Sequence, residues 1–224
     1  QYQKALKINP SLFQVHNSIA ILLAQRGDFS EALSHYQQAI TLHPSFAQAY
    51  NNMGNALQSE GKLEAAKGSY DKAINIEPTY FEACFNKGNT LQRMEKLDDA
   101  IKSYEKAIEI RPDSAESYYC IGIVSYSQKI LDVAINNYQK AIEINPEHLS
   151  ANFNLGVIFL ELDKLLEAEK SFRKTVSIKP DYFEALANLG VILKKLDKLE
   201  EADSTLKLAI SANPNSAPVY FNRG

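Results

Sequence analysis

Seven prolines recur at intervals of 34 residues along this chain of 224 residues. They are Pro10, Pro44, Pro78, Pro112, Pro146, Pro180 and Pro214. A residue that recurs at one period over a whole chain marks an internal repeat, and periods of about 20–50 residues are typical of solenoids, propellers and arrays. The sequence therefore predicts one elongated array in which each repeat contacts only its neighbours, although the length alone would suit one or two globular domains.

The prolines also set the expected boundaries of the repeats. When each periodic proline is position 32 of a repeat, the complete repeats cover 13–46, 47–80, 81–114, 115–148, 149–182 and 183–216. Residues 1–12 are then the second helix of a preceding repeat, and residues 217–224 begin the first helix of a further one. We therefore expect both ends of the chain to be cuts through a longer array.

Each repeat has the pattern of two helices, called helix A and helix B. Large residues at positions 4, 7 and 11 share one face of helix A. Position 8 is glycine in most repeats. Because a glycine inside a helix costs roughly 1 kcal/mol relative to alanine, its recurrence predicts that helix B comes close there. Helix B carries alanine at positions 20 and 27 and a ring at position 24 in most repeats. In 47–80 these residues are Tyr50, Met53, Gly54, Leu57, Ala66, Tyr70 and Ala73.

Charged and capping residues mark the helix ends. The first turn of helix B is acidic, which complements the partial positive charge of a helix N-terminus. These acids are Glu31, Glu64, Asp98, Asp132, Glu167 and Glu200. The periodic proline ends helix B because it lacks an N–H group. The residues after the proline are predicted to cap the next helix A, and they include Ser45, Thr79, Asp113, Asp181 and Asn215. Lys87 replaces an apolar residue at position 7, and we expect its stem to follow the helix surface while its ammonium group reaches solvent.

About six positions recur together at fixed spacing, and this set resembles the tetratricopeptide repeat family over the whole chain. The resemblance implies an all-α, right-handed α-solenoid of stacked helix–turn–helix repeats. It also implies that the A helices line a concave groove, with positions 2, 5, 6, 9, 12 and 13 facing a bound guest. Because these positions are not needed for the core, their residues carry the functional information.

The groove positions change from amide-rich to apolar along the chain. Asparagine is frequent at position 6, and its amide can pair with a peptide group of an extended guest. Contiguous exposed apolar surface usually marks a contact site. The predicted partner-binding residues are Asn51, Asn52, Asn55, Phe85, Asn86, Asn89, Tyr119, Ile123, Tyr126, Phe153, Asn154, Val157, Asn188 and Val191. The alternative interpretation of the apolar residues is that a neighbouring repeat covers them.

The helix A sequences NNMGNAL, FNKGNTL, FNLGVIF and ANLGVIL also resemble the asparagine ladder in the repeat domain of O-linked N-acetylglucosamine transferases. The alternative explanation is that asparagine is simply the commonest residue at this position in the whole family. The leading hypothesis is a protein-interaction scaffold that binds a peptide or partner segment. Two alternatives stay open: the substrate-recruiting arm of a larger glycosyltransferase, and a self-assembling module that forms homo-oligomers through open array ends.

Other functions are predicted to be absent from this segment. The net charge of −3 and the isoelectric point of about 5.9 give no reason to expect a nucleic-acid partner. No apolar run is long enough for a membrane span. The four histidines fall at four different repeat positions, so we expect no metal, cofactor or catalytic site and no enzyme activity. Cys84 has the place of a buried apolar residue, whereas Cys120 lies nearer the groove, where a thiol could react, although no neighbouring residue resembles an activating base. Two cysteines suit a reducing compartment, so a cytoplasmic or otherwise intracellular location is expected.

Overall fold

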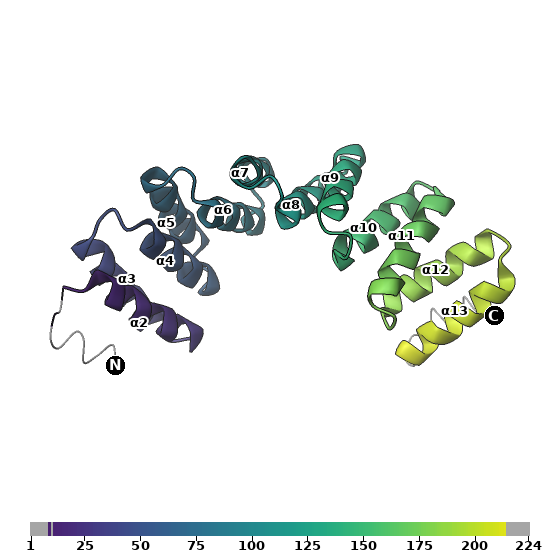
Figure 1. Ribbon diagram of the computed structural model, residues 1–224, viewed down its shortest axis with the longest axis horizontal. Coiled ribbons are helices and arrows are strands. Elements are labelled where there is room, and N and C mark those ends of the chain that lie inside the picture. The colour runs from purple at the N-terminus through teal and green to yellow at the C-terminus, as the bar shows by residue number, and fades with distance from the viewer. Residues whose placement is uncertain (1–8, 10, 214–224) are drawn as a thin grey trace. The chain divides into compact units, whose positions relative to one another are not determined.

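The computed structural model describes residue 9 and residues 11–213, and within these residues it is built of twelve α-helices without a β-strand (Figure 1). The helices are α2 (Phe13–Gln25), α3 (Phe29–Leu42), α4 (Ala47–Ser59), α5 (Leu63–Ile76), α6 (Phe81–Arg93), α7 (Leu97–Ile110), α8 (Ala115–Ser127), α9 (Leu131–Ile144), α10 (Leu149–Glu161), α11 (Leu165–Ile178), α12 (Phe183–Lys195) and α13 (Leu199–Ala212). The even-numbered helices are the predicted A helices and the odd-numbered ones the B helices. The partial repeats expected at 1–12 and 217–224 lie almost wholly outside the described residues, as does Asn215.

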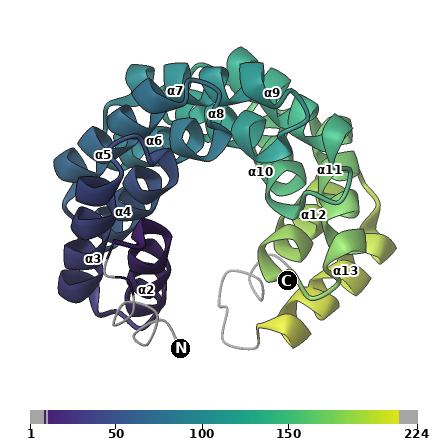
Figure 2. The ribbon, with the colours of Figure 1, turned by 60° about the vertical axis from the view of Figure 1, so that its left-hand side comes forward.

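The chain divides into an N-terminal half, Gln1–Asp113, and a C-terminal half, Ser114–Gly224. Within each half, every A helix packs against the B helix that follows it, and each B helix packs against the next A helix. In the N-terminal half, Figure 2 shows α2, α4 and α6 as one layer and α3, α5 and α7 as the other. The C-terminal half repeats this arrangement with α8, α10 and α12 against α9, α11 and α13.

The predicted close approach at position 8 is confirmed. The ring of Tyr104 on α7 is fully buried and lies flat against Gly88 of α6. A Cβ atom added at Gly88 would lie 2.5 Å from Cε1 of Tyr104. Gly122 stands in the same relation to Tyr138, with a distance of 2.5 Å. At Gly88 and Gly122 the ring therefore occupies the volume of the missing side chain, whereas in the first repeat Ala20 has this position and is buried in one cluster with Tyr36.

The turn between helix A and helix B has a left-handed residue that the sequence pattern did not predict. It is glycine in the first two repeats, Gly27 and Gly61, but a polar residue in the next four. These are Glu95, Lys129, Asp163 and Asp197, with φ between 55° and 62°. At Gly61, the amide donates to the carbonyl of Gln58 at 3.0 Å, and the next amide, of Lys62, donates to Leu57 at 2.9 Å. These bonds form a Schellman motif, which satisfies the last carbonyls of helix A.

The prediction that the residue after each proline caps helix A is wrong. The capping residue is one position later, at Phe46, Tyr80, Ser114, His148 and Tyr182. The residue after the proline, Ser45, instead lies inside the turn that reverses the chain. This turn is closed by the amide of Phe46, which donates to the carbonyl of His43 at 3.1 Å. Only Ser114 and His148 among these five accept a hydrogen bond from the first turn of helix A. The acidic first turns of the B helices are confirmed.

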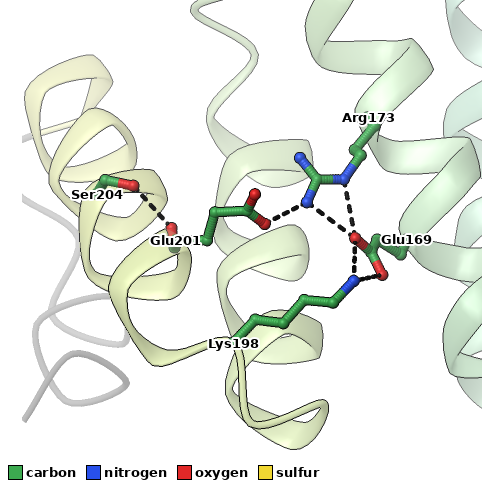
Figure 3. A network of polar contacts seen from close by, with 5 residues as sticks. All are labelled: Glu169, Arg173, Lys198, Glu201 and Ser204. Atoms are coloured by element: carbon green, nitrogen blue, oxygen red, sulfur yellow. Dashed lines mark hydrogen bonds and ion pairs between the residues drawn. The ribbon is translucent and has the colours of Figure 1, made fainter.

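A network of charges joins neighbouring B helices in the C-terminal half (Figure 3). The carboxylate of Glu169 on α11 is nearly buried, and the Nζ atom of Lys198 lies 2.8 and 2.7 Å from its two oxygens. Arg173 donates to Glu169 through Nε at 2.9 Å and also to Glu201 on α13. Ser204 donates to the backbone carbonyl of Glu201 at 2.9 Å. The network therefore ties α11 to the start of α13 through charged and hydrogen-bonded side chains.

The glycine contact gives a first prediction. In Gly88→Ala, the added methyl group overlaps the buried ring of Tyr104, and we expect the free energy of unfolding to fall by about 1–3 kcal/mol. The control is Gly68→Ala on α5, where an added Cβ meets nothing within 4 Å. That substitution should raise stability by about 0.5–1 kcal/mol because it removes only the flexibility of glycine. Urea unfolding followed by circular dichroism measures both changes, and equal effects of the two substitutions would contradict the packing argument.

The charge network gives a pH-dependent prediction. Burial by itself raises the pKa of Glu169, but hydrogen bonds from Lys198 and Arg173 hold that pKa below its ordinary value. A carboxyl with a lowered folded-state pKa stabilises the fold above roughly pH 4.3, and this contribution is lost as the pH falls below that value. We expect Glu169→Gln to lower the free energy of unfolding by about 1 kcal/mol at pH 7 and by progressively less below about pH 4. A difference that stays constant between pH 7 and pH 3 would contradict this role.

Candidate functional site

The predicted partner-binding residues all lie on A helices, and together they define the A-helix surface of each half. In the N-terminal half they are Asn51, Asn52 and Asn55 of α4 and Phe85, Asn86 and Asn89 of α6. In the C-terminal half they are Tyr119, Ile123 and Tyr126 of α8, Phe153, Asn154 and Val157 of α10, and Asn188 and Val191 of α12. Most are half-buried, whereas Asn51 is buried and Asn55 is exposed.

Asparagine side chains of neighbouring repeats are hydrogen-bonded to each other in the N-terminal half. The Nδ2 atom of Asn86 donates to Oδ1 of Asn51 at 3.1 Å, and Nδ2 of Asn52 donates to Oδ1 of Asn17 at 3.2 Å. Each bond runs from position 6 of one repeat to position 5 of the preceding repeat. Because a carboxamide has two N–H donors and two acceptor lone pairs, these bonds leave capacity for a guest. The amide row is therefore both a link between repeats and a polar surface.

Asn55 and Asn89 have a second role that the sequence pattern did not reveal. The hydroxyl of Tyr70 donates to Oδ1 of Asn55, with the oxygens 2.7 Å apart, and that of Tyr104 lies 2.8 Å from Oδ1 of Asn89. Each of these tyrosines fills the position 24 slot of the core, so only its hydroxyl reaches the A-helix surface. Burial raises the pKa of Tyr70, which keeps the hydroxyl protonated as a donor. The sequence signal for these hydrogen bonds was the constant spacing of 15 residues between each asparagine and its tyrosine.

A shallow depression of ≈ 260 Å³ opens on the A-helix surface between α2 and α4. Asn52 and Asn55 form its polar side, and Ile21 and Phe29 form its apolar side. The ring of Tyr36 forms part of its lining. Two of the predicted residues are thereby brought together around one hollow that combines amide groups with an apolar wall.

The A-helix surface of the C-terminal half is apolar and rests directly on the core. Tyr119, Ile123, Phe153 and Val157 are partly buried and pack against the core cluster of that half. The ring of Phe153 lies 5.7 Å from that of Phe172 and 5.0 Å from that of Tyr182, measured between centroids. Such pairs fix the rings, so one side of each is packed and the other faces outward. This half therefore presents a preorganised apolar strip.

Polar groups border this apolar strip. Asn154 donates from Nδ2 to the hydroxyls of Tyr119 and Tyr138, each at 3.4 Å. Tyr126 donates to the carboxylate of Glu161 on α10, and this hydrogen bond raises the pKa of Tyr126 to about 12. Position 5 of the preceding repeat, which pairs with Asn86 in the N-terminal half, is Phe153 in the case of Asn188, and its ring offers no hydrogen-bond acceptor. The amide of Asn188 therefore lacks the inter-repeat acceptor that Asn86 has.

Two histidines meet in the structure, and both cysteines are buried. His16 and His35 share a hydrogen bond between their Nδ1 atoms at 3.0 Å, and burial together with the charge of His16 lowers the pKa of His35. Burial raises the pKa of the Cys84 thiol. Cys120 is only 7 % exposed, so the expectation of an accessible thiol near the groove is wrong.

No group of three or more His, Cys, Asp and Glu side chains in residue 9 and residues 11–213 could hold a metal ion. No described helix combines the length and apolar character that crossing a bilayer requires.

The asparagine pairs give a prediction that separates their structural role from binding. Asn86→Ala removes the donor to the buried Oδ1 of Asn51, and we expect a loss of about 1–3 kcal/mol in the free energy of unfolding. Asn188→Ala occupies the same repeat position without that acceptor, and its loss should stay below about 0.5 kcal/mol. Denaturant unfolding compares the two variants, and equal losses would show that the Asn86–Asn51 bond contributes nothing.

Comparisons with known proteins agree with this geometry. Profiles of the tetratricopeptide repeat match residues 47–80, 69–102, 149–182 and 183–216, and a profile described as TPR repeat matches 22–61, 88–129 and 124–163. No curated protein sequence matches.

Solved structures share the fold. The chain is 26% identical to YrrB, described as a TPR protein with an unusual peptide-binding site, over 83% of this chain and 96% of YrrB, with a TM-score of 0.69. It is also 26% identical to MamA over 76% of this chain and 93% of that protein, with a TM-score of 0.68. PilF of Pseudomonas aeruginosa is 18% identical and has a TM-score of 0.76, over 93% of this chain and 95% of PilF. The twelve helices stack in pairs as in these solenoids, and the profiles together span most of the sequence. The chain belongs to the tetratricopeptide repeat family.

Proposed function

We propose that this chain is a protein-interaction scaffold that binds an extended segment of a partner protein along its A-helix surface. The observation that carries the proposal is the apolar strip of the C-terminal half. The side chains of Tyr119, Ile123, Phe153 and Val157 remain partly exposed on α8 and α10, although each repeat already has a filled core. Side chains of this kind, kept partly in water, are typical of a contact surface.

The two halves offer different recognition chemistry. In the N-terminal half, the amides of Asn52 and Asn86 have donors and acceptors beyond those used between repeats, and these can pair with the peptide groups of an extended segment. In the C-terminal half, ring and aliphatic side chains suit apolar side chains of the partner. A polar, extended segment would suit the surface of the N-terminal half, and an apolar segment would suit that of the C-terminal half.

The comparison with YrrB supports this proposal. That protein is described as having a peptide-binding site, and it aligns over 83% of this chain. Family membership adds to this support because stacked helical repeats provide extended binding surfaces. A partner would therefore be recognised through several adjacent repeats, each contributing a few side chains.

The substrate-recruiting arm of a glycosyltransferase stays an alternative prediction, based on the asparagines of helix A. Their bonds between repeats, such as Asn86 to Asn51, give the asparagine pattern an internal role as well. Self-assembly is favoured by one observation: large apolar side chains are exposed in the C-terminal half. They are Ile130, Val133, Leu162, Leu166, Leu199 and Leu208. Light scattering over a range of concentrations measures self-association directly.

The binding proposal is tested with Ile123→Lys combined with Val157→Lys. Both side chains lie on the apolar strip, and two charges there should weaken binding of a selected peptide at least tenfold, since burying each charge costs more than about 1.4 kcal/mol. The peptide is selected from a random library on the unaltered protein, and its affinity is measured by fluorescence anisotropy. Helicity should be unchanged because both residues are only partly buried.

The matched control is Val133→Lys combined with Leu166→Lys. These residues are exposed on the B helices α9 and α11, and they undergo the same change from aliphatic to lysine. Binding should survive in the control. Loss of binding in the control, with binding kept in the Ile123 and Val157 variant, would place the contact on the B helices and contradict the proposal.

A further inference from the structure

A basic pocket opens between neighbouring B helices of the N-terminal half, away from the A-helix surface. Its volume is ≈ 370 Å³, and Cys84 and Leu91 of α6 form its apolar floor. Four lysines line it: Lys67 from α5, Lys87 from α6, and Lys102 and Lys106 from α7. None of the predicted A-helix residues belongs to its lining.

Lys87 has no counterpart in the other repeats. Position 7 is otherwise apolar, with Ile19, Met53, Ile121, Leu155 and Leu189 in the remaining complete repeats. The expectation that its ammonium group simply reaches solvent is corrected, because Nζ lies 2.7 Å from Oδ1 of Asp71 and the side chain is 26% exposed. The stacking of the repeats does not require a cation here, so the charge needs another explanation.

Asp71 forms ion pairs with two lysines at once. Nζ of Lys67 lies 2.9 Å from its Oδ2 atom while Lys87 occupies Oδ1, and all three side chains are two-thirds or more buried. Burial by itself raises the pKa of Asp71, but hydrogen bonds from Lys87 and Lys67 hold that pKa below its ordinary value. The carboxylate is therefore charged at neutral pH, so these three groups carry a net charge of +1, and the more distant acids Glu64 and Asp99 also act on Lys67.

The residues of α7 on the opposite wall of the pocket do not cancel this excess of positive charge. Lys102 lies 3.4 Å from Asp99, and Lys106 lies 2.7 Å from Glu109, so each lysine of α7 has one carboxylate. Four ammonium groups thus face three carboxylates. Each ammonium has three N–H donors, and a single ion pair leaves donors for a further acceptor.

The C-terminal half contains the same groove with two lysines, Lys170 and Lys174, in place of four. A pocket of ≈ 510 Å³ occupies the equivalent repeat positions between α9 and α11, over Leu155 and Phe159 of α10. Leu155 stands where Lys87 is, and Ile135 of α9 stands where Lys67 is. The groove is therefore a consequence of helix stacking, whereas the basic lining is a property of Lys67 and Lys87.

We propose that the basic pocket binds a doubly charged oxyanion of the phosphate type, either free or carried on a side chain of a partner. Lysine binds phosphate oxygens through charge-assisted hydrogen bonds, and partial burial strengthens the attraction by excluding water. A bound phosphate group would neutralise the excess charge of Lys67 and Lys87 and accept their remaining N–H groups. This site lies apart from the A-helix surface, and it does not depend on peptide binding there.

The test is a titration with inorganic phosphate at constant ionic strength, followed by NMR of the backbone amides of α5, α6 and α7. Saturable shifts around the pocket are expected. Lys87→Met introduces the residue that Met53 supplies at the same repeat position, and it should weaken phosphate binding roughly tenfold because the excess charge is gone. Lys72→Met, on the exposed side of α5 and outside the pocket lining, is the matched control and should bind as the unaltered protein does.

A second pair of variants makes a prediction of opposite sign. Asp71→Asn removes the shared carboxylate and should tighten phosphate binding roughly tenfold, because Lys67 and Lys87 then lack their counter-charge. Its control is Glu105→Gln, which removes an exposed acid at the same repeat position in the next repeat. If Lys87→Met and Lys72→Met changed the affinity for phosphate equally, or if the two acid variants did, the change would come from the overall surface charge. Either result would overturn the proposal.

Two peptide probes identify the source of the anion. A phosphoserine peptide and its unphosphorylated twin are titrated beside inorganic phosphate, and chloride at matched ionic strength is the blank. Binding of the phosphorylated peptide but not its twin indicates a partner side chain, and binding of inorganic phosphate alone indicates a free anion. Equal shifts with chloride, or no shift with either phosphate probe while helicity is native, would overturn the site.

Discussion

The contact between a glycine of helix A and a ring of helix B is the constraint on which the rest of the structure depends. At Gly88 and Tyr104 the two helices approach until the ring fills the space of a side chain, and the ring is completely buried. This contact fixes the distance and rotation of the helix pair. It also carries the tyrosine hydroxyl through to the other side of helix A, where Asn89 accepts its hydrogen bond. The core contact therefore orients part of the candidate binding surface.

The A-helix surface differs between the two halves because the same frame carries different side chains. In the N-terminal half, amides link consecutive repeats, as Asn86 does with Asn51. These bonds hold the asparagine side chains in defined orientations, which lowers the entropy cost when a guest binds. In the C-terminal half, Phe153 is fixed by Phe172 and Tyr182 instead. Both arrangements preorganise the surface, one through polar bonds and the other through packing.

Residues that depart from the repeat pattern account for much of the difference between the two halves of this chain. A groove between B helices recurs in both halves, but only the N-terminal one has Lys67 and Lys87 in its lining. Glu169 of α11 has the same position within its repeat as Lys67 of α5, and it binds Lys198 and joins neighbouring helices. One repeat position thus supplies a cation for a pocket in one half and an anion for inter-helix bonding in the other.

The sequence by itself determined the helix pairs, the close approach of helix B at position 8 and the placement of the candidate residues on A helices, because these follow from spacings within one repeat. Only the tertiary structure decided that Phe46 rather than Ser45 precedes helix A, and that Asn86 bonds to Asn51. It also decided that Cys120 is buried and that Lys87 shares Asp71 with Lys67. These features depend on the geometry of turns and on contacts between neighbouring repeats, where side chains far apart in sequence meet. The periodic sequence pattern does not show which of these side chains bond to each other.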